Sequence, residues 1–370
     1  MRLRVALSLI ALAAAAVPAQ AKDLPIDLLN APDGFKIAIY AEDVDGARSL
    51  AVSPKGTVFI GTRGADHFYA VEDKDGDHVA ETVHTLGSGL NSPNGMVFHD
   101  GALYVAEISR ILKYNDIENH LDALPEPEVV IDTLPTEEHH GWKYMAMGPD
   151  GKLYFNIGAP CNLCNKEEED ERFATISRVN TDGSDFEIVA RGVRNSVGIT
   201  WDPTTGQMWF TDNNRDLMGD DRPACELNHA TEQGQHFGFP YCHQGDLPDP
   251  EFIADRDCSE FTPPALKLQA HVAPLGLKFY TGTMFPEEYR GAIFVAEHGS
   301  WNRSIPIGYR IAVVKPDADG NCTSADTFID GWLRRLLAWG RPVDILFLED
   351  GSMLVSDDKG GVLYRISYGE

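Results

Sequence analysis

One pattern of apolar and polar positions recurs along the chain. An apolar strand is followed by a turn with Asp-Gly or Pro-Asp-Gly, and then by a second strand rich in aromatic and β-branched residues. The second strands align at residues 56–63, 101–108, 151–158, 206–213, 291–298 and 351–358. Their partners lie in residues 49–55, 94–100, 144–150, 198–205, 275–282 and 344–350. A further strand follows most units, at residues 68–73, 111–116, 175–180, 309–314 and 362–367.

These six units lie about 45–60 residues apart, with one longer gap. Short, evenly spaced strands separated by turn residues predict an all-β fold, a six-bladed β-propeller. A β-sandwich is the competing all-β fold, but it does not account for six self-similar units. Three cysteines and several prolines occupy the long gap at residues 214–272. We therefore expect a disulfide-containing insertion between blades 4 and 5, covering one face.

The N-terminus has the features of an export signal. Arg2 and Arg4 precede an apolar run from residue 5 to 17, and Ala-Gln-Ala at 19–21 offers a small-residue cleavage site. The run is shorter than the ~20 residues that a spanning helix needs, and no later segment reaches that length. The sequence thus predicts a signal peptide at residues 1–21, a single propeller domain at residues 22–370, and a periplasmic or secreted protein.

The charge balance limits the possible partners. Acidic residues outnumber basic ones 57 to 31, for a formal net charge of -26. Nucleic-acid binding and adsorption to anionic lipid both need a basic surface, so neither is expected. An anionic ligand needs a local cluster of cations to overcome the overall negative field.

The chain has six cysteines, which in an exported protein indicate disulfides. Cys161 and Cys164 form a CxxC motif, but Asn165 follows where haem attachment needs histidine. No second ligand pair at zinc spacing stands out, so a tight-loop disulfide is the preferred interpretation. Pairing stays open among the remaining cysteines, Cys225, Cys242, Cys258 and Cys322.

Propeller geometry predicts which residues meet. The innermost strand of each blade runs from one face to the other and its partner returns, so residues before inner strands and after second strands share one mouth. Those before inner strands are Arg48, Asn94, His140, Arg194, Asn195 and Arg341. Those after second strands are Arg63, Arg110, Asn213, Asn214, Arg215, His298 to Arg303, and Lys359. A strongly acidic protein thus gathers cations at one mouth.

Guanidinium groups converging from several blades predict a site for a compact polyanion that carries carboxylates or phosphates. The alternative is that some of these arginines only neutralise Asp212, Glu297 and Asp357, which also approach the mouth.

The mouth also has candidate bases. His140 precedes the third inner strand, and a histidine there can act as a general base near neutral pH. His298 is the second candidate and His139 a weaker one. The alternative for each is a structural histidine that is bonded to a backbone carbonyl.

Four segments carry a resemblance to a known family: residues 139–154, 192–203, 273–303 and 340–361. They resemble the soluble pyrroloquinoline quinone (PQQ)-dependent sugar dehydrogenases of the glucose/sorbosone dehydrogenase family, and are most similar to its sorbosone-dehydrogenase-like branch. The resemblance implies a six-bladed propeller with PQQ and Ca²⁺ in the central mouth. PQQ carries three carboxylates, in agreement with the cation cluster.

The resemblance also implies roles for individual residues. His140 matches the histidine that removes the substrate hydroxyl proton, while Arg194, Asn195 and Arg341 match cofactor contacts, Arg194 also assisting catalysis. Further cofactor contacts are expected from His298, Trp301, Arg303 and Lys359. Calcium is expected at the backbone of Asn214 and Arg215.

This chain departs from the glucose-oxidising members at three points. Ala159 stands where they have a carboxylate near the catalytic histidine, Val343 replaces a second arginine, and the calcium loop lacks their Gly-Pro. The resemblance therefore supports the cofactor but not glucose as substrate.

The sequence as a whole predicts a PQQ-dependent dehydrogenase that oxidises an aldose or related sugar and passes electrons to a separate acceptor, a cytochrome or a quinone. Two alternatives stay open. A calcium-dependent lactonase-type propeller hydrolase would use Asp212, Asn213 and Glu297 as metal ligands. A non-catalytic binding propeller would account for the fold alone.

Overall fold

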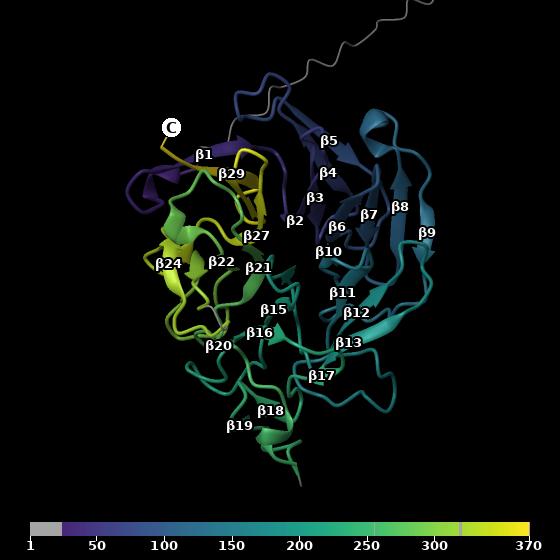
Figure 1. The fold of residues 1–370 in the computed structure, drawn as a ribbon, viewed down its shortest axis with the longest axis vertical. Coiled ribbons are helices and arrows are strands. Elements are labelled where there is room, and N and C mark those ends of the chain that lie inside the picture. Colours follow the sequence, from purple (N-terminus) through teal and green to yellow (C-terminus); the bar gives the residue numbers. More distant parts are fainter. Residues whose placement is uncertain (1–23, 255, 318–319, 370) are drawn as a thin grey trace, which may run out of the picture.

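The computed structural model describes residues 24–254, 256–317 and 320–369, so the predicted signal peptide lies outside the described residues. Six β-sheets stand around a ring (Figure 1), which confirms the predicted six-bladed propeller. None of the described helices has the length and apolarity to cross a membrane. They are the short turns η1 (Ile26–Leu28), η2 (Ile117–Asn119), η3 (Cys258–Glu260) and η4 (Glu287–Tyr289).

The blades follow the chain in order. Blade 1 has β2 (Ala47–Val52), β3 (Val58–Thr62), β4 (Phe68–Glu72) and β5 (Thr82–Leu86). Blade 2 has β6 (Gly95–His99), β7 (Ala102–Ala106), β8 (Ile111–Asn115) and β9 (Glu128–Ile131). Blade 3 has β10 (Met145–Met147), β11 (Leu153–Ile157), β12 (Thr175–Val179), β13 (Glu187–Arg191) and the added β17 (Gln235–His236).

The second half continues this order. Blade 4 has β14 (Ile199–Trp201), β15 (Met208–Asp212), β16 (Glu226–Ala230) and β20 (Leu266–Lys267). Blade 5 has β21 (Pro274–Phe279), β22 (Ile293–Glu297), β23 (Arg310–Val314) and β24 (Asp326–Ile329). Blade 6 has β27 (Pro342–Phe347), β28 (Met353–Asp357), β29 (Val362–Tyr368) and β1 (Phe35–Ala41). Two small hairpins stand apart, β18 (Cys242–His243) with β19 (Leu247–Pro248), and β25 (Leu333–Arg334) with β26 (Leu337–Ala338).

All six predicted inner hairpins are confirmed. In each, a glycine in the connecting turn has φ between 71° and 91°. Only glycine adopts this conformation without steric cost, which explains why the Asp-Gly turn recurs. The six glycines are Gly56, Gly101, Gly151, Gly206, Gly291 and Gly351.

The second strand of every blade is buried at each of its residues. These strands lie inside a sheet whose two faces are both covered, which favours mainly apolar residues along them. A separate hydrophobic cluster fills the space between each pair of neighbouring blades. The ring is therefore a rigid frame for the loops at its mouth.

The ring closes through strands from the two ends of the sequence. β1 pairs antiparallel with β29, from Phe35 opposite Tyr368 to Ala41 opposite Leu363. Figure 1 shows the purple first strand beside the yellow last one. This pairing ties the two chain ends into one blade, so that blade 6 has four strands like its neighbours.

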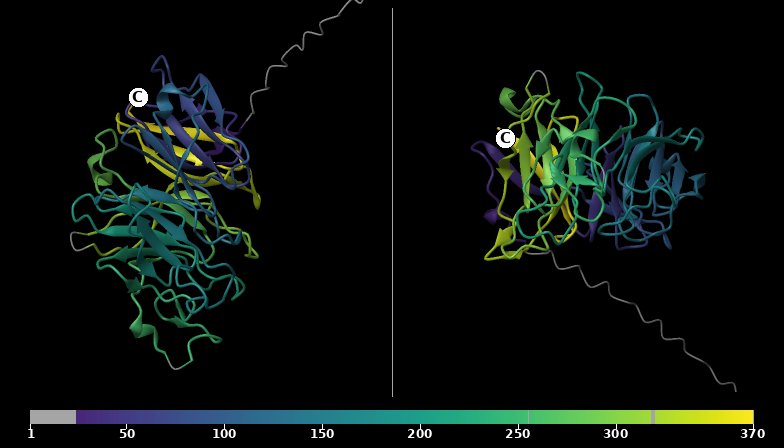
Figure 2. Two further views of the ribbon diagram at one scale, coloured as in Figure 1. Left: turned by 90° about the vertical axis from the view of Figure 1, so that its right-hand side faces the viewer. Right: turned by 90° about the horizontal axis from the view of Figure 1, so that it is seen from below.

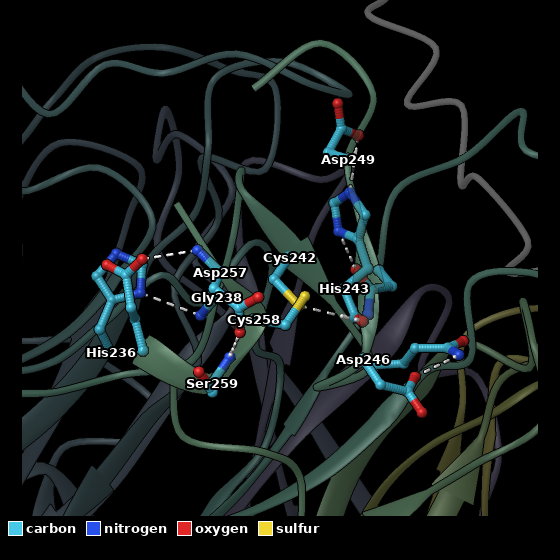
Figure 3. Close-up of a disulfide and its surroundings, with 12 residues drawn as sticks. His236, Gly238, Cys242, His243, Asp246, Asp249, Asp257, Cys258 and Ser259 are labelled. Carbon is cyan, nitrogen blue, oxygen red and sulfur yellow. Dashed lines mark hydrogen bonds and ion pairs between the residues drawn. A yellow bond between two sulfur atoms is a disulfide. The ribbon is translucent and has the colours of Figure 1, made fainter. Parts of the chain in front are cut away.

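The predicted insertion contains a disulfide, Cys242–Cys258 (Figure 3). Its ends supply the outer strands of blade 4, β16 and β20, and residues 231–265 lie between them. This segment extends outward from the rim beside blades 3 and 4 (Figures 1 and 2). The expectation that it covers one face is therefore wrong, since β17 and β20 hold it at the edges of two blades.

The predicted tight-loop disulfide Cys161–Cys164 is present. Cys225 and Cys322 are free thiols.

Candidate active site

The loops at the predicted mouth enclose a cavity of about 400 Å³ at the centre of the ring. Its lining comes from blades 1, 3, 4, 5 and 6. The lining residues are Arg48, Arg63, Glu138, His139, His140, Trp142, Arg194, Asn195, Asn213, Asn214, Asp216, Cys225, His271, Ala273, Leu275, His298, Gly299, Trp301, Asn302 and Arg341. The cavity thus brings together arginines, histidines and amides that are far apart in the sequence.

The buried carboxylates beneath the mouth do not neutralise its arginines. Asp212 accepts hydrogen bonds from the backbone N–H groups of Arg194 (2.9 Å) and Asn195 (2.7 Å). Asp357 likewise accepts from the backbone N–H of Arg341 at 2.8 Å. Glu297 pairs with Arg310. These carboxylates therefore fix the loops and leave the guanidinium groups of Arg194 and Arg341 for other contacts.

Two other carboxylates do pair with cavity arginines. Asp358 accepts from Arg48 Nη1 at 2.7 Å, and Asp216 accepts from Arg194 Nη2 at 3.3 Å. The guanidinium of Arg341 donates only to the carbonyls of His298 (3.0 Å) and Gly299 (2.7 Å) among the described residues.

Arg63 has no carboxylate partner in the described part of the chain. Its guanidinium lies 3.6 Å from the centroid of the Trp142 ring, a cation–π contact. Burial, together with Arg48 and Arg341 nearby, lowers its pKa to about 10. Four guanidinium groups exceed the three carboxylates at the cavity, which are the paired Asp216 and Asp358 and the exposed Glu138, and this excess positive charge suits an anionic ligand.

His140 faces this cavity from the start of blade 3. The Ala159 carbonyl accepts a hydrogen bond from its Nδ1 at 2.8 Å. Because a carbonyl can only accept, Nδ1 carries the proton and Nε2 is the basic atom of the neutral ring. Nε2 has no hydrogen-bond partner among the described residues, and the ring lies 4.1 Å from that of His139. The backbone carbonyl of Ala159 thus orients the ring at the position where the sequence lacks the family's carboxylate.

Two further features distinguish His140 from an ordinary surface histidine. Burial, with the positive charge of Arg194 and smaller contributions from His139 and Arg63, lowers its pKa well below the ordinary value of 6.5. Its φ of 53° lies in the left-handed region, which is strained for a residue with a side chain. Gly158 makes room for it, since a β-carbon there would come within 2.6 Å of His140 Cβ.

His298 is bonded to a carboxylate. Its Nε2 donates to Asp358 at 2.9 Å. Burial, with Arg341 and Arg48 nearby, lowers the pKa of His298 to about 4, so the ring is neutral at pH 7. The same neighbours keep Asp358 ionised, with a pKa below its ordinary value despite burial. The one N–H of the neutral His298 ring is therefore used on Asp358, and its Nδ1 can only accept a hydrogen bond.

The predicted calcium loop lies where blade 4 meets the insertion. Asn214 lines the cavity, and its side chain bonds to Glu226 (2.7 Å) and to His243 (3.0 Å). Arg215 turns away and pairs with Asp249, which also bonds to His243 (Figure 3). The insertion thus braces this loop from outside.

Oxygen donors face the cavity close to this loop. Asn195 Oδ1 and Asn302 Oδ1 are buried without a hydrogen-bond partner among the described residues. The Asp216 carboxylate accepts from Asn302 Nδ2 at 3.0 Å. Carboxylate and amide oxygens are the ligands that Ca²⁺ prefers, so the donor set fits a hard cation.

The remaining predicted residues lie at the edge of the site. Trp301 lines the cavity with 71% of its surface exposed. Arg303 bonds to the Asp220 carbonyl and joins two rim loops, while Lys359 is exposed, and neither lines the cavity. Arg110 pairs with Glu107 outside it.

Within residues 24–254, 256–317 and 320–369, the three ligands expected for a lactonase-type metal site do not converge on the cavity. Asp212 and Glu297 are buried and lie outside the cavity lining, and Asn213 Nδ2 donates to the carbonyls of Asn195 and Pro274.

Sequence reasoning missed several residues of the site, among them Trp142, Asp216 and Asp358. Each is adjacent to a predicted segment, Asp358 directly following Asp357 in the last blade. Position after a second strand was the available signal for Asp216 and Asp358.

A propeller with an arginine-rich central cavity and a neutral, oriented histidine defines a class of protein whose central site suits an anionic ligand. The chain belongs to the TrAA12-like family, which it matches over residues 29–369. This is a family of oxidoreductases similar to PQQ-dependent sugar dehydrogenases, so the resemblance seen in the sequence is confirmed.

Relatives and solved structures agree with this assignment. The chain is 34% identical over 358 residues to an uncharacterized protein of Borreliella burgdorferi, covering 92% of this chain and 91% of that protein. It is 23% identical over 305 residues to a PQQ-dependent sugar dehydrogenase of Hypocrea jecorina, covering 68% of this chain and 70% of that protein. The calcium structure of the Trichoderma reesei family AA12 enzyme superimposes with a TM-score of 0.80 at 20% identity, over 92% of this chain and 97% of that one.

A second solved structure has the same fold. The holo form of the pyranose dehydrogenase PQQ domain from Coprinopsis cinerea superimposes with a TM-score of 0.78 at 18% identity, over 92% of this chain and 97% of that domain. The full-length enzyme from that organism is 24% identical over 407 residues, covering 91% of this chain but 54% of the enzyme.

Proposed function

We propose that this protein is a PQQ-dependent dehydrogenase that oxidises an aldose or related sugar in its central cavity. The observation that carries the proposal is the excess of guanidinium groups around a neutral histidine whose Nε2 is free. Three carboxylates on PQQ complement Arg63, Arg194 and Arg341, and Arg63 lacks any carboxylate partner among the described residues. Relatives that carry the name of PQQ-dependent sugar dehydrogenases support the same cofactor and substrate class.

When bound, PQQ supplies the acceptor for the hydride of the substrate. The protein supplies the base and the orientation. His140 accepts the proton of the substrate hydroxyl at Nε2, while its Nδ1–H stays bonded to the Ala159 carbonyl. Its lowered pKa keeps the ring unprotonated and ready to accept a proton at neutral pH. Arg194 and Arg341 hold anionic groups and orient the ligand through fixed guanidinium planes.

We propose Ca²⁺ as the second cofactor, held by the Asn214–Arg215 loop together with the unpaired oxygens of Asn195 and Asn302. A divalent cation there would add to the charge that stabilises an anionic ligand. The solved calcium structure of a family AA12 enzyme supports this choice.

We also propose that the protein works in the periplasm or outside the cell. The signal-like residues 1–21 and the disulfides Cys161–Cys164 and Cys242–Cys258 support an oxidising compartment. Electrons then pass to a separate acceptor, a cytochrome or a quinone.

A reconstitution titration tests the proposal. The chain is purified without cofactor, PQQ and Ca²⁺ are added, and dye reduction is followed with a panel of aldoses, sorbosone and simple alcohols. We expect saturable activation at about one PQQ per chain. His140→Ala should bind PQQ but lose turnover, whereas His120→Ala, an exposed histidine of blade 2, should behave as wild type. Absence of PQQ binding, or full turnover in His140→Ala, would refute the assignment.

A further inference from the structure

The loop after β11 touches both candidate catalytic residues. The backbone N–H of Ala159 donates to the Arg194 carbonyl at 2.8 Å, and the Ala159 carbonyl accepts from His140 Nδ1 at 2.8 Å. One residue of blade 3 thus links the histidine before its own inner strand to the arginine before the inner strand of blade 4.

Asn162, three residues further on, holds the Arg194 side chain. Its carbonyl accepts from Arg194 Nε at 2.9 Å, and its Oδ1 accepts from Arg194 Nη2 at 2.9 Å. The same Oδ1 accepts the backbone N–H of Asp216 at 2.8 Å. Two bonds to one edge of a planar guanidinium fix its rotation as well as its position. Only 3% of the Arg194 side chain is exposed, so it has little freedom beyond these contacts.

The conformation of Asn162 is itself constrained. The disulfide Cys161–Cys164 brackets it within a four-residue loop. Asn165 lies outside this closed loop, and its Nδ2 donates to the Tyr241 hydroxyl at 2.6 Å. Asn162 is absent from the residues that line the cavity. Its contacts therefore serve Arg194 and Asp216 rather than a ligand.

We propose that Asn162, presented by the disulfide-closed loop, is a positioning residue that holds the Arg194 guanidinium in place against His140 and the bound cofactor. The inference rests on the proposed function. Partners that orient a site residue typically change activity by ~10–100-fold when removed, and a displacement of ~1 Å at a reacting centre has an effect of the same order.

The arrangement also predicts a shift in the pH profile. Charged and titratable groups facing His140 are Arg194, His139 and Arg63, all of which lower its pKa, while the Ala159 carbonyl raises it. If Arg194 moves away, the largest of these electrostatic effects on His140 weakens, and the pKa of His140 rises. The acid limb of kcat/KM then moves to higher pH, an effect that loss of stability alone does not produce.

The test compares Asn162→Ala, Asn162→Asp and Asn165→Ala in the purified chain loaded with PQQ and Ca²⁺. We expect Asn162→Ala to lower kcat by roughly 10–100-fold and to move the acid limb to higher pH. Asn162→Asp keeps an acceptor for Arg194 Nη2 and should restore most of kcat. Asn165→Ala is the matched control, because the Asn165 amide bonds to Tyr241 and not to Arg194. This variant should keep wild-type kcat and pH profile. The double variant Cys161→Ser, Cys164→Ser should change both in the direction of Asn162→Ala.

A cofactor-free measurement separates this inference from the proposed function. A double-mutant cycle between Asn162→Ala and Arg194→Met, read in urea unfolding, reports their interaction whether or not PQQ binds. We expect a coupling of at least about tenfold in the unfolding equilibrium constant. No coupling, or wild-type kcat and pH profile in Asn162→Ala, would overturn the role of Asn162. Coupling in a protein that binds no PQQ would instead refute only the proposed function.

Discussion

Asn94 bonds to the cavity arginine Arg48, and we predict that loss of the Asn94 side chain destabilises both the fold and the site. It is fully buried at the start of blade 2. Its Oδ1 accepts from Arg48 Nε at 2.9 Å, and its Nδ2 donates to the Lys143 carbonyl at 2.7 Å and to Ser49 Oγ at 3.1 Å. Through these three bonds one side chain connects blades 1, 2 and 3.

The magnitude follows from what Asn94→Ala leaves behind. The Ser49 hydroxyl can rotate to another partner, but Arg48 Nε and the Lys143 carbonyl lose theirs in a buried place. An unsatisfied buried group costs about 1–3 kcal/mol, more for a charged one, so the free energy of unfolding should fall by about 3–5 kcal/mol. Arg48 keeps its bond to Asp358, so PQQ affinity should weaken by only about three- to tenfold, the equivalent of roughly 1 kcal/mol.

Urea unfolding of the cofactor-free chain and a PQQ titration measure the two effects. Asn115→Ala is the matched control, because this asparagine of the same blade is exposed and its amide bonds to Glu128. It should change stability by less than about 0.5 kcal/mol. A loss below about 1 kcal/mol for Asn94→Ala, within error of the control, would refute the reasoning that the three bonds hold the blades together.

Three further predictions concern charged and titratable groups, two in the site and one buried in the frame. Arg63→Met should leave the free energy of unfolding nearly unchanged, because this exposed arginine has no carboxylate partner among the described residues, yet should weaken PQQ binding about tenfold or more in a titration. A pH–rate profile of kcat/KM should show an acid limb below pH 6.5, since burial and Arg194 lower the pKa of His140, and a limb at or above pH 7 would contradict the environment described. Burial raises the pKa of Asp344 to about 6, so the folded state keeps this proton to higher pH than the unfolded chain. Asp344 therefore lowers stability as pH rises from about 4 to 7, and in urea unfolding Asp344→Asn should gain roughly 2–3 kcal/mol relative to wild type over that interval.

The hairpins could be predicted because their determinants are local. A positive-φ glycine and a fully buried, mainly apolar second strand recur in each blade, so six copies reinforce one another. β1 (Phe35–Ala41) escaped detection for the opposite reason. Its burial alternates along the strand, and its partner β29 lies more than 300 residues away. Pairing of Cys242 with Cys258 likewise depends on how the insertion folds, which the spacing of four cysteines does not determine.

The residues that lie at the mouth could be predicted from the strand order of the propeller, but the contacts among their side chains could not. Strand order places Arg48, Arg194 and Arg341 at one end of the ring whatever their side chains do. Whether a nearby carboxylate bonds to a guanidinium or to a backbone N–H depends on distances of about an ångström. Ala159 shows the same limit, because a backbone carbonyl takes over an orienting role that side-chain identity alone does not reveal.

The carboxylates at the ends of the second strands explain how this fold builds an anion site in an acidic protein. Asp212 accepts a hydrogen bond from the backbone N–H of Arg194, and Asp357 accepts one from the backbone N–H of Arg341. Glu107 likewise accepts a hydrogen bond from the backbone N–H of Asn91. Burial raises the pKa of Asp212 and Asp357 despite these backbone hydrogen bonds, which limits the negative charge beneath the guanidinium groups that extend into the cavity. Since the same bonds close the blade and aim the arginine, stability and ligand affinity share a structural cause at these positions.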